Sequence, residues 1–183
     1  MFKVVSLFIL LLISESSSED NKLLKVFPVP PTNDNSLFYI QRSKNTNAII
    51  YELNRSQDGN PDPINPIHIY WIRYASDSTK EELSYIQSKY AYGMTVRPYG
   101  GQKNSFVMQF VSYDKKTLYL LPTNTPKKYA VYTNINGKLS ELKKAFIKLN
   151  GGTFWFPTIE YIDMIGKDPS TQQTVTERFL PKK

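Results

Sequence analysis

The sequence predicts a mainly β domain, either an antiparallel β-sandwich or a partly open barrel, with one short packed helix at about residues 79–91. Turn signals recur at short intervals, and the segments between them are rich in Tyr, Phe, Ile, Val and Thr, which favour strands. No repeat of about 20–50 residues is visible, so we expect neither a propeller nor a solenoid. The turn signals are Asp58-Gly59, Gly100-Gly101, Asn136-Gly137, Gly151-Gly152 and Asp168-Pro169.

The first 18 residues predict a secretory signal peptide. Lys3 supplies the positive start, and an apolar run broken only by Ser6 extends from Val4 to Ile13. This run is too short for a membrane-spanning helix, which takes about 20 residues. Small polar residues follow at Ser14–Ser18, where we expect cleavage. The predicted location is therefore outside the cell, in the periplasm or elsewhere at the cell envelope.

The rest of the chain divides into a short leader and one domain. Residues 19–35 contain three prolines and little apolar periodicity, so we expect an extended leader that lies along the domain. Residues 36–183 have the length of a single β-rich domain. We expect strands at Leu37–Gln41, Ala48–Asn54, Ile67–Tyr74, Thr95–Pro98, Ser105–Ser112, Thr117–Leu121, Tyr129–Ile135, Lys144–Leu149, Thr153–Ile165 and Thr174–Phe179.

One segment has helix signals. Ser78 and Glu81 have the spacing of a capping box, in which each side chain bonds the backbone N–H of the other residue. We expect this helix to end at Gly93, because glycine readily takes the backbone conformation that follows a helix. An apolar stripe with helical spacing is formed by Leu83, Ile86 and Tyr90. Residues 139–149 fit both a helix and a strand, and the Gly151-Gly152 turn favours a strand for their second half.

The composition excludes several classes of site. The chain has no cysteine and one histidine, so it has no disulfide, no thiolate metal site, no cysteine nucleophile and no site that needs two imidazoles. No G-x-S-x-G, H-E-x-x-H, phosphate-loop or dinucleotide-binding motif is present. We therefore predict no catalytic residue, no metal ligand and no cofactor from motifs.

A ligand site is predicted around the only histidine and the expected helix. In a strand, His68 shares a face with Tyr70, and Arg73 lies on the other face. His68 is a structural residue bonded to a tyrosine or to the backbone, a ligand contact, or a catalytic base. Arg73 either ends its strand in solvent or pairs with Glu81, Glu82 or a ligand anion. The candidate ligand-binding residues are His68, Tyr70, Arg73, Glu82, Tyr85 and Tyr92.

The net charge of +7 is concentrated in one part of the chain. Residues 97–148 hold ten Lys/Arg and two Asp/Glu. These cations could engage an anionic polymer or a membrane surface, or they could simply protect exposed sheet edges. We do not expect a nucleic acid partner, because the cations are mostly lysine and no recognition helix is predicted. The candidate basic patch is Lys115, Lys116, Lys127, Lys128, Lys143 and Lys144.

Three segments carry a resemblance to a known family. They read PIHIYWIRY, ELSYIQSKYAYG and GGTFWFPTIEYI, at residues 66–74, 82–93 and 151–162. In this order they resemble a family of bacterial secreted domains described as domain of unknown function 4833. The resemblance extends over about residues 25–181, and it implies a single-domain exported protein without implying an activity or catalytic residues.

These observations predict an exported, non-catalytic β-rich domain that binds a ligand or partner at the cell envelope or outside the cell. The alternative is an unrecognised hydrolase with a site around His68, Arg73 and the helix at Glu81–Tyr92. The two can be distinguished by geometry. Convergence of His68, a carboxylate and a hydroxyl in an open pocket favours the enzyme.

Overall fold

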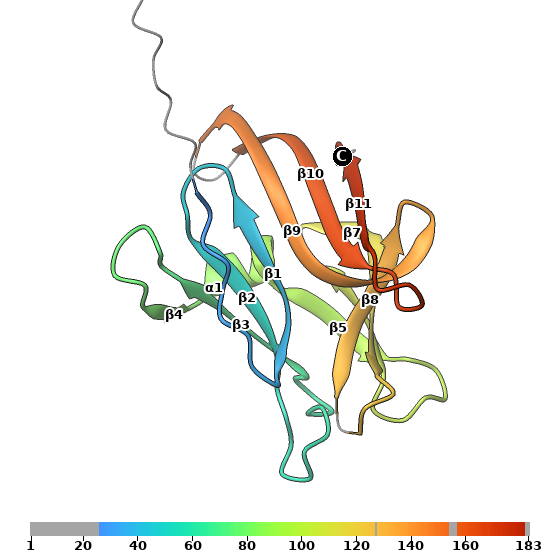
Figure 1. Cartoon of the computed structure of the whole chain (residues 1–183). Helices are drawn as coiled ribbons and strands as arrows, with labels where there is room; N and C mark the ends of the chain where they lie inside the picture. Colours follow the sequence, from blue (N-terminus) through green and yellow to red (C-terminus); the bar gives the residue numbers. More distant parts are fainter. Residues whose placement is uncertain (1–25, 127, 154–156, 182–183) are drawn as a thin grey trace, which may run out of the picture.

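The structure is a computed structural model that describes residues 26–126, 128–153 and 157–181. It is a mainly β fold, as predicted, in which one strongly curled open sheet forms a half-barrel (Figure 1). The strands are β1 (Ser36–Arg42), β2 (Ala48–Leu53), β3 (Ile67–Ile72), β4 (Lys80–Glu82), β5 (Met94–Pro98), β6 (Phe106–Phe110), β7 (Tyr113–Pro122), β8 (Tyr129–Ile135), β9 (Lys138–Gly152), β10 (Pro157–Lys167) and β11 (Thr174–Phe179). The helical segments are α1 (Tyr85–Gln87) and a single π-helical segment, η1 (Ser88–Tyr92).

Each of the ten predicted strands overlaps a strand of the structure. One of them, Thr153–Ile165, includes residues 154–156, which lie outside the described part of the chain. The ambiguous residues 139–149 lie entirely in β9. The Asn136-Gly137 turn joins β8 to β9 with φ of 51° and 80°, the left-handed conformations of a tight hairpin turn.

Strand β9 holds the halves of the sheet together. Its first residues, Lys138–Glu141, pair with β8, and Lys144–Ile147 pair with β1. Strand β10 pairs with β9 from Glu141 to Gly152 and carries β11 on its other side. The β1–β9 pairing is parallel, which departs from the antiparallel hairpins predicted. Hairpin signals are local, whereas this contact joins strands about 100 residues apart, so no turn predicts it.

The core lies inside the curl of the sheet. Tyr51, Trp71 and Leu118 are among its fully buried side chains. The opposite face of β2 and β3 carries a smaller buried cluster that includes Ile50 and Tyr70. The predicted alternation of the two faces along Ile67–Tyr74 is therefore confirmed.

The single short helix is confirmed, but its predicted start is wrong. The N-cap is Ser84, whose Oγ accepts from Gln87 N at 3.3 Å, while Ser84 N donates to Gln87 Oε1 at 3.0 Å. Residues Lys80–Glu82, which the prediction placed in the first turn, form β4 on the edge of β3. Backbone pairing with that edge has taken precedence over the local capping signal at Ser78.

The predicted packing face of the helix is wrong for two of its three residues. Leu83, just before the helix, packs against the core, but Ile86 is 46% exposed and Tyr90 is 62% exposed. Instead, the end of the helical segment turns Tyr92 toward the core. Gly93 ends the helical segment, as predicted.

The segment before β1 lies against the sheet. Phe27 contacts Phe146 edge to face at 5.2 Å, and Gln41 Nε2 donates to Pro28 O at 2.7 Å. The predicted signal peptide lies outside the described residues. Among the helices of the described segments, none is long and apolar enough to cross a membrane.

Candidate functional site

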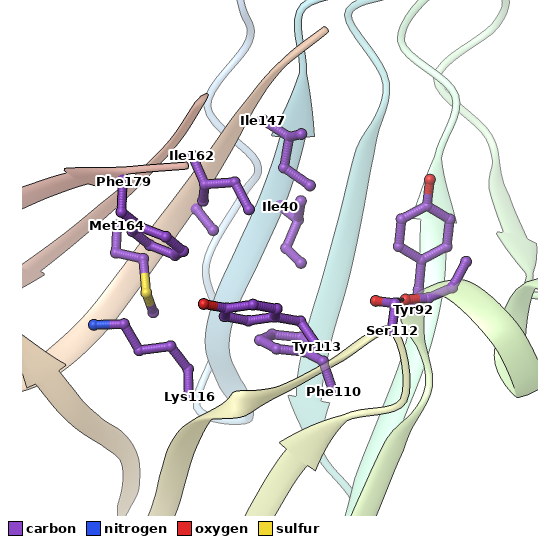
Figure 2. Close-up of a pocket in the computed structure, with 12 residues that line it drawn as sticks. Ile40, Tyr92, Phe110, Ser112, Tyr113, Lys116, Ile147, Ile162, Met164 and Phe179 are labelled. Carbon is purple, nitrogen blue, oxygen red and sulfur yellow. Dashed lines mark hydrogen bonds between the residues drawn. The ribbon is translucent and has the colours of Figure 1, made fainter. Parts of the chain in front are cut away.

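A cavity of about 80 Å³ lies inside the half-barrel, and we call it the inner cavity (Figure 2). Strands β1, β9 and β10 form one wall, and β6, β7, β11 and the end of η1 supply the rest. Most of its surface is apolar. The apolar side chains that line it include Ile40, Phe110, Ile147, Ile162, Met164 and Phe179.

The inner cavity has a simple origin in the sequence. Residue pairing places Ala145 of β9 between Ile40 of β1 and Met164 of β10. Alanine is too short to fill the space that its larger neighbours enclose, so the centre of this wall is hollow. Because side chains alternate along a strand, Ile147 and Ile162 point to the same interior face.

Tyr92 forms the wall of the inner cavity opposite Ile162 (Figure 2). Its carbonyl accepts from Tyr51 Oη at 2.8 Å, and its ring meets Trp71 edge to face at 5.3 Å. Its hydroxyl accepts from Arg42 Nη1 at 2.6 Å. Burial raises the pKa of Tyr92, and the nearby Arg42 charge partly offsets this. Tyr92 is thus a neutral side chain in a fixed position.

At the other end of the inner cavity, the positive charge of Lys116 is balanced by a carboxylate. Lys116 is only 18% exposed, and its Nζ donates to Glu177 at 2.7 and 2.9 Å and to Asn134 O at 3.0 Å. Burial raises the pKa of Glu177, but the hydrogen bonds from Lys116 and the Asn136 amide outweigh that effect and lower it. This end of the inner cavity therefore has little uncompensated charge.

Arg42, which was not among the predicted site residues, does not line the inner cavity but adjoins Ile147 and Tyr92, which do. It shares the inner face of β1 with Ile40 and is paired in register with Ile147. Its Cζ lies 5.0 Å from the ring centroid of Trp71 and 5.6 Å from that of Tyr92. A signal was available, because a period of two places Arg42 on the apolar side of Leu37–Gln41.

Two predicted site residues meet in a second, more polar groove of about 250 Å³, which we call the outer groove. His68 Nε2 lies 2.9 Å from Glu82 Oε1, and Ser88 lines the same groove. His68 is 48% exposed, and its partner is a carboxylate rather than the tyrosine or backbone group considered from the sequence. No hydrogen bond joins His68 to Ser88 in the described part of the chain.

The remaining predicted residues do not join either site directly. Arg73 pairs with Glu81 through Nε at 2.6 Å and Nη2 at 2.8 Å and stacks on Trp71. Of the two alternatives predicted for Arg73, the structure shows pairing with a glutamate, but Glu81 lies in strand β4 and not in the expected helix. Tyr70 lies in the cluster on the opposite sheet face, where burial and a hydrogen bond with Glu52 raise its pKa. Tyr85 is exposed and bonds Lys89.

The basic residues lie on different elements. Lys115 and Lys116 are on β7, Lys128 precedes β8, and Lys143 and Lys144 are on β9. Adjacent residues of a strand point to opposite faces, so the two lysines of each pair on β7 and β9 lie on opposite faces of the sheet. Lys128 faces Asp34 at 3.5 Å, Lys143 pairs with Glu141, and burial lowers the pKa of Lys144. Lys127 lies outside the described residues.

Comparison with known proteins gives one match. A family model described as a domain of unknown function (DUF4833) matches residues 38–178. The matched range covers most of the chain and includes the residues of both the inner cavity and the outer groove, apart from Phe179. No curated protein and no solved structure gives a significant match.

Proposed function

This chain belongs to the family of the domain of unknown function DUF4833, and we propose that its half-barrel binds the hydrocarbon chain of a small amphiphile in the inner cavity. The observation that carries this proposal is an apolar cavity centred on the small side chain of Ala145, between Ile40 and Met164. When a hydrocarbon group covers apolar surface that is left unfilled inside a fold, the free energy of the system falls.

The size of the inner cavity sets the expected ligand. A cavity needs a volume of about 10–15 Å³ to hold one water molecule. A volume of about 80 Å³ therefore accommodates about five to eight groups of the size of a water or a methylene. We expect a chain of about five to eight carbon atoms, or the terminal part of a longer chain, to fit.

Export is part of the same proposal, and the sequence of residues 1–18 supports it. Expression of the full chain and of a variant without residues 2–18 tests this step. We expect the full chain outside the cytoplasm with a new N-terminus within or just after Ser14–Ser18, and the shortened variant inside. An unprocessed full chain in the cytoplasm would contradict export and would leave the binding proposal untouched.

Calorimetric titration with hexanol, heptanol and octanol tests the binding proposal. Each added methylene contributes about 0.8 kcal/mol, so affinity should rise about fourfold per carbon until the inner cavity is full. Ala145→Leu, which fills the cavity from its wall, should abolish binding. If Ala145→Leu fails to fold, Ala91→Leu at the rim of the cavity serves as a second filling variant.

Ala75→Leu is the matched control, because it adds the same three carbon atoms at an exposed residue outside the inner cavity. It should bind octanol as the unaltered protein does. Equal affinity of Ala145→Leu and Ala75→Leu for octanol, or no binding of any alcohol, would overturn the proposal.

One observation favours a second candidate, hydrolysis in the outer groove. His68, Glu82 and Ser88 line one open groove, which is the convergence that the sequence alternative requires. Ester hydrolysis by Ser88 would use His68 as the base and Glu82 as its orienting carboxylate. Turnover of p-nitrophenyl acetate that disappears in both Ser88→Ala and His68→Asn would support this candidate, and turnover unchanged in Ser88→Ala would refute it.

A further inference from the structure

Arg42 has fewer hydrogen-bond acceptors than its guanidinium can use. A guanidinium has five N–H donors in a plane, and among the described residues the Arg42 side chain makes one hydrogen bond, from Nη1 to the Tyr92 hydroxyl. Its Nε atom is buried without a hydrogen-bond partner in the described part of the chain. A buried donor without an acceptor is costly, so the position calls for a further acceptor.

The other cations nearby differ from Arg42 in this respect. Arg73 stacks on the same Trp71 ring with its Cζ 4.9 Å from the centroid, but it has the Glu81 carboxylate as a bidentate partner. Lys116 has the Glu177 carboxylate. No described carboxylate forms an ion pair with Arg42. The guanidinium is therefore half-buried among aromatic rings, and no residue in the described ranges supplies a counter-ion.

The position of Arg42 relates it to the inner cavity. Two residues along one face of a strand are about 7 Å apart, and that separates Arg42 from Ile40, which lines the cavity. Tyr92 contacts both, since its ring forms the cavity wall and its hydroxyl accepts from Arg42. A ligand that fills the cavity toward Ile147 would therefore place its polar end at Arg42.

We propose that Arg42 binds the anionic head group, a carboxylate or a phosphate, of the amphiphile whose chain occupies the inner cavity. This inference rests on the proposed function and adds the charge of the ligand to it. Planar carboxylates and phosphates match the paired N–H groups of arginine, and the aromatic neighbours keep the guanidinium in place. The anion supplies the acceptor that Arg42 lacks.

Calorimetric titration at neutral pH and low salt with octanoate, octyl phosphate, octanol, octylamine and acetate tests the inference. A hydrogen-bonded charge should make octanoate or octyl phosphate bind about ten- to hundredfold more tightly than octanol. Octylamine should bind more weakly than octanol, and acetate, which has no chain, should not bind measurably. Whichever of the two anions binds more tightly identifies the head group.

Arg42→Gln should bring the affinity for the anions down to that for octanol, while the affinity for octanol stays unchanged. The matched control is Arg73→Gln, which removes the other arginine stacked on Trp71 and should keep the preference for anions. Thermal unfolding of both variants checks that they are folded, and Arg42→Met, which also removes the charge, replaces Arg42→Gln if the latter is not.

The outcomes separate the two proposals. If octanol and octanoate bind equally, or if Arg42→Gln keeps the preference for octanoate, the inference fails while the apolar site remains. If none of the eight-carbon ligands binds, the proposed function itself fails.

Discussion

The structure leaves no room for a side chain at Gly93, and Gly93→Ala therefore tests how the wall of the inner cavity is built. A Cβ atom at Gly93 would lie 1.9 Å from Ser88 O, the carbonyl of the first residue of η1. Carbon and oxygen atoms that are not bonded do not approach so closely, so η1 would have to move by more than an ångström. Tyr92 belongs to η1 and would move with it.

The expected cost follows from this contact. Side chains forced into packed regions cost about 1–3 kcal/mol. Loss of glycine from the unfolded chain returns about 0.4–1 kcal/mol, so the midpoints of the two ranges give a net loss of about 1.3 kcal/mol. For a chain of this size, the melting temperature should fall by about 3–5 °C. Affinity for octanol should fall as well, because Tyr92 leaves its position in the cavity wall.

Gly100→Ala is the matched control, because a Cβ at Gly100 has no neighbour within 4 Å. The stability of both variants is measured by urea unfolding, which is followed by tryptophan fluorescence. Trp71, which is buried beside Tyr92, contributes to this signal. Gly100→Ala should be as stable as the unaltered protein or slightly more stable. Equal urea midpoints for the two variants would show that the contact between Gly93 and Ser88 does not determine the position of η1.

Two further substitutions test the remaining supports of the inner cavity. The folded pKa of Glu177 is lowered, so its pair with Lys116 stabilises the fold above the unfolded pKa and this contribution is lost as the pH falls through the folded value. Glu177→Gln should therefore destabilise the protein at pH 7 and lose that effect in acid, and urea midpoints that differ equally at pH 7 and pH 3 would contradict this. Tyr51→Phe removes the hydroxyl that donates to Tyr92 O and should cost about 1 kcal/mol, or about 2–4 °C in melting temperature. An unchanged melting temperature would mean that this bond contributes nothing net.

The strands could be predicted from the sequence because their signals are local. Each turn, such as Asn136-Gly137, restricts a few neighbouring dihedral angles, and the apolar and polar faces alternate between the turns. The predicted start of the helix is wrong because the capping signal at Ser78 can begin a helix only if the residues after it are not paired in a sheet. Residues Lys80–Glu82 are held by the edge of β3, so the next available cap, Ser84, begins the helix.

The inner cavity could not be predicted, because it depends on which strands meet. Ala145 leaves a hollow only because the parallel pairing with β1 and the antiparallel pairing with β10 place Ile40 and Met164 beside it. His68 and Arg73 stand out in the sequence as unusual residue types, and in the structure each has a carboxylate partner. Arg42 does not stand out by residue type, although alternation along β1 places it on the apolar face.

A crystal structure of the protein with octanoate is the decisive test of the inner cavity as a ligand site. We expect the hydrocarbon chain inside the half-barrel, in contact with Ile40, Ile147 and Ile162, and displacement of that chain by the Ala145→Leu side chain. Octanoate ordered only in the outer groove or on the surface, or an inner cavity that holds no hydrocarbon at saturating octanoate, would contradict it.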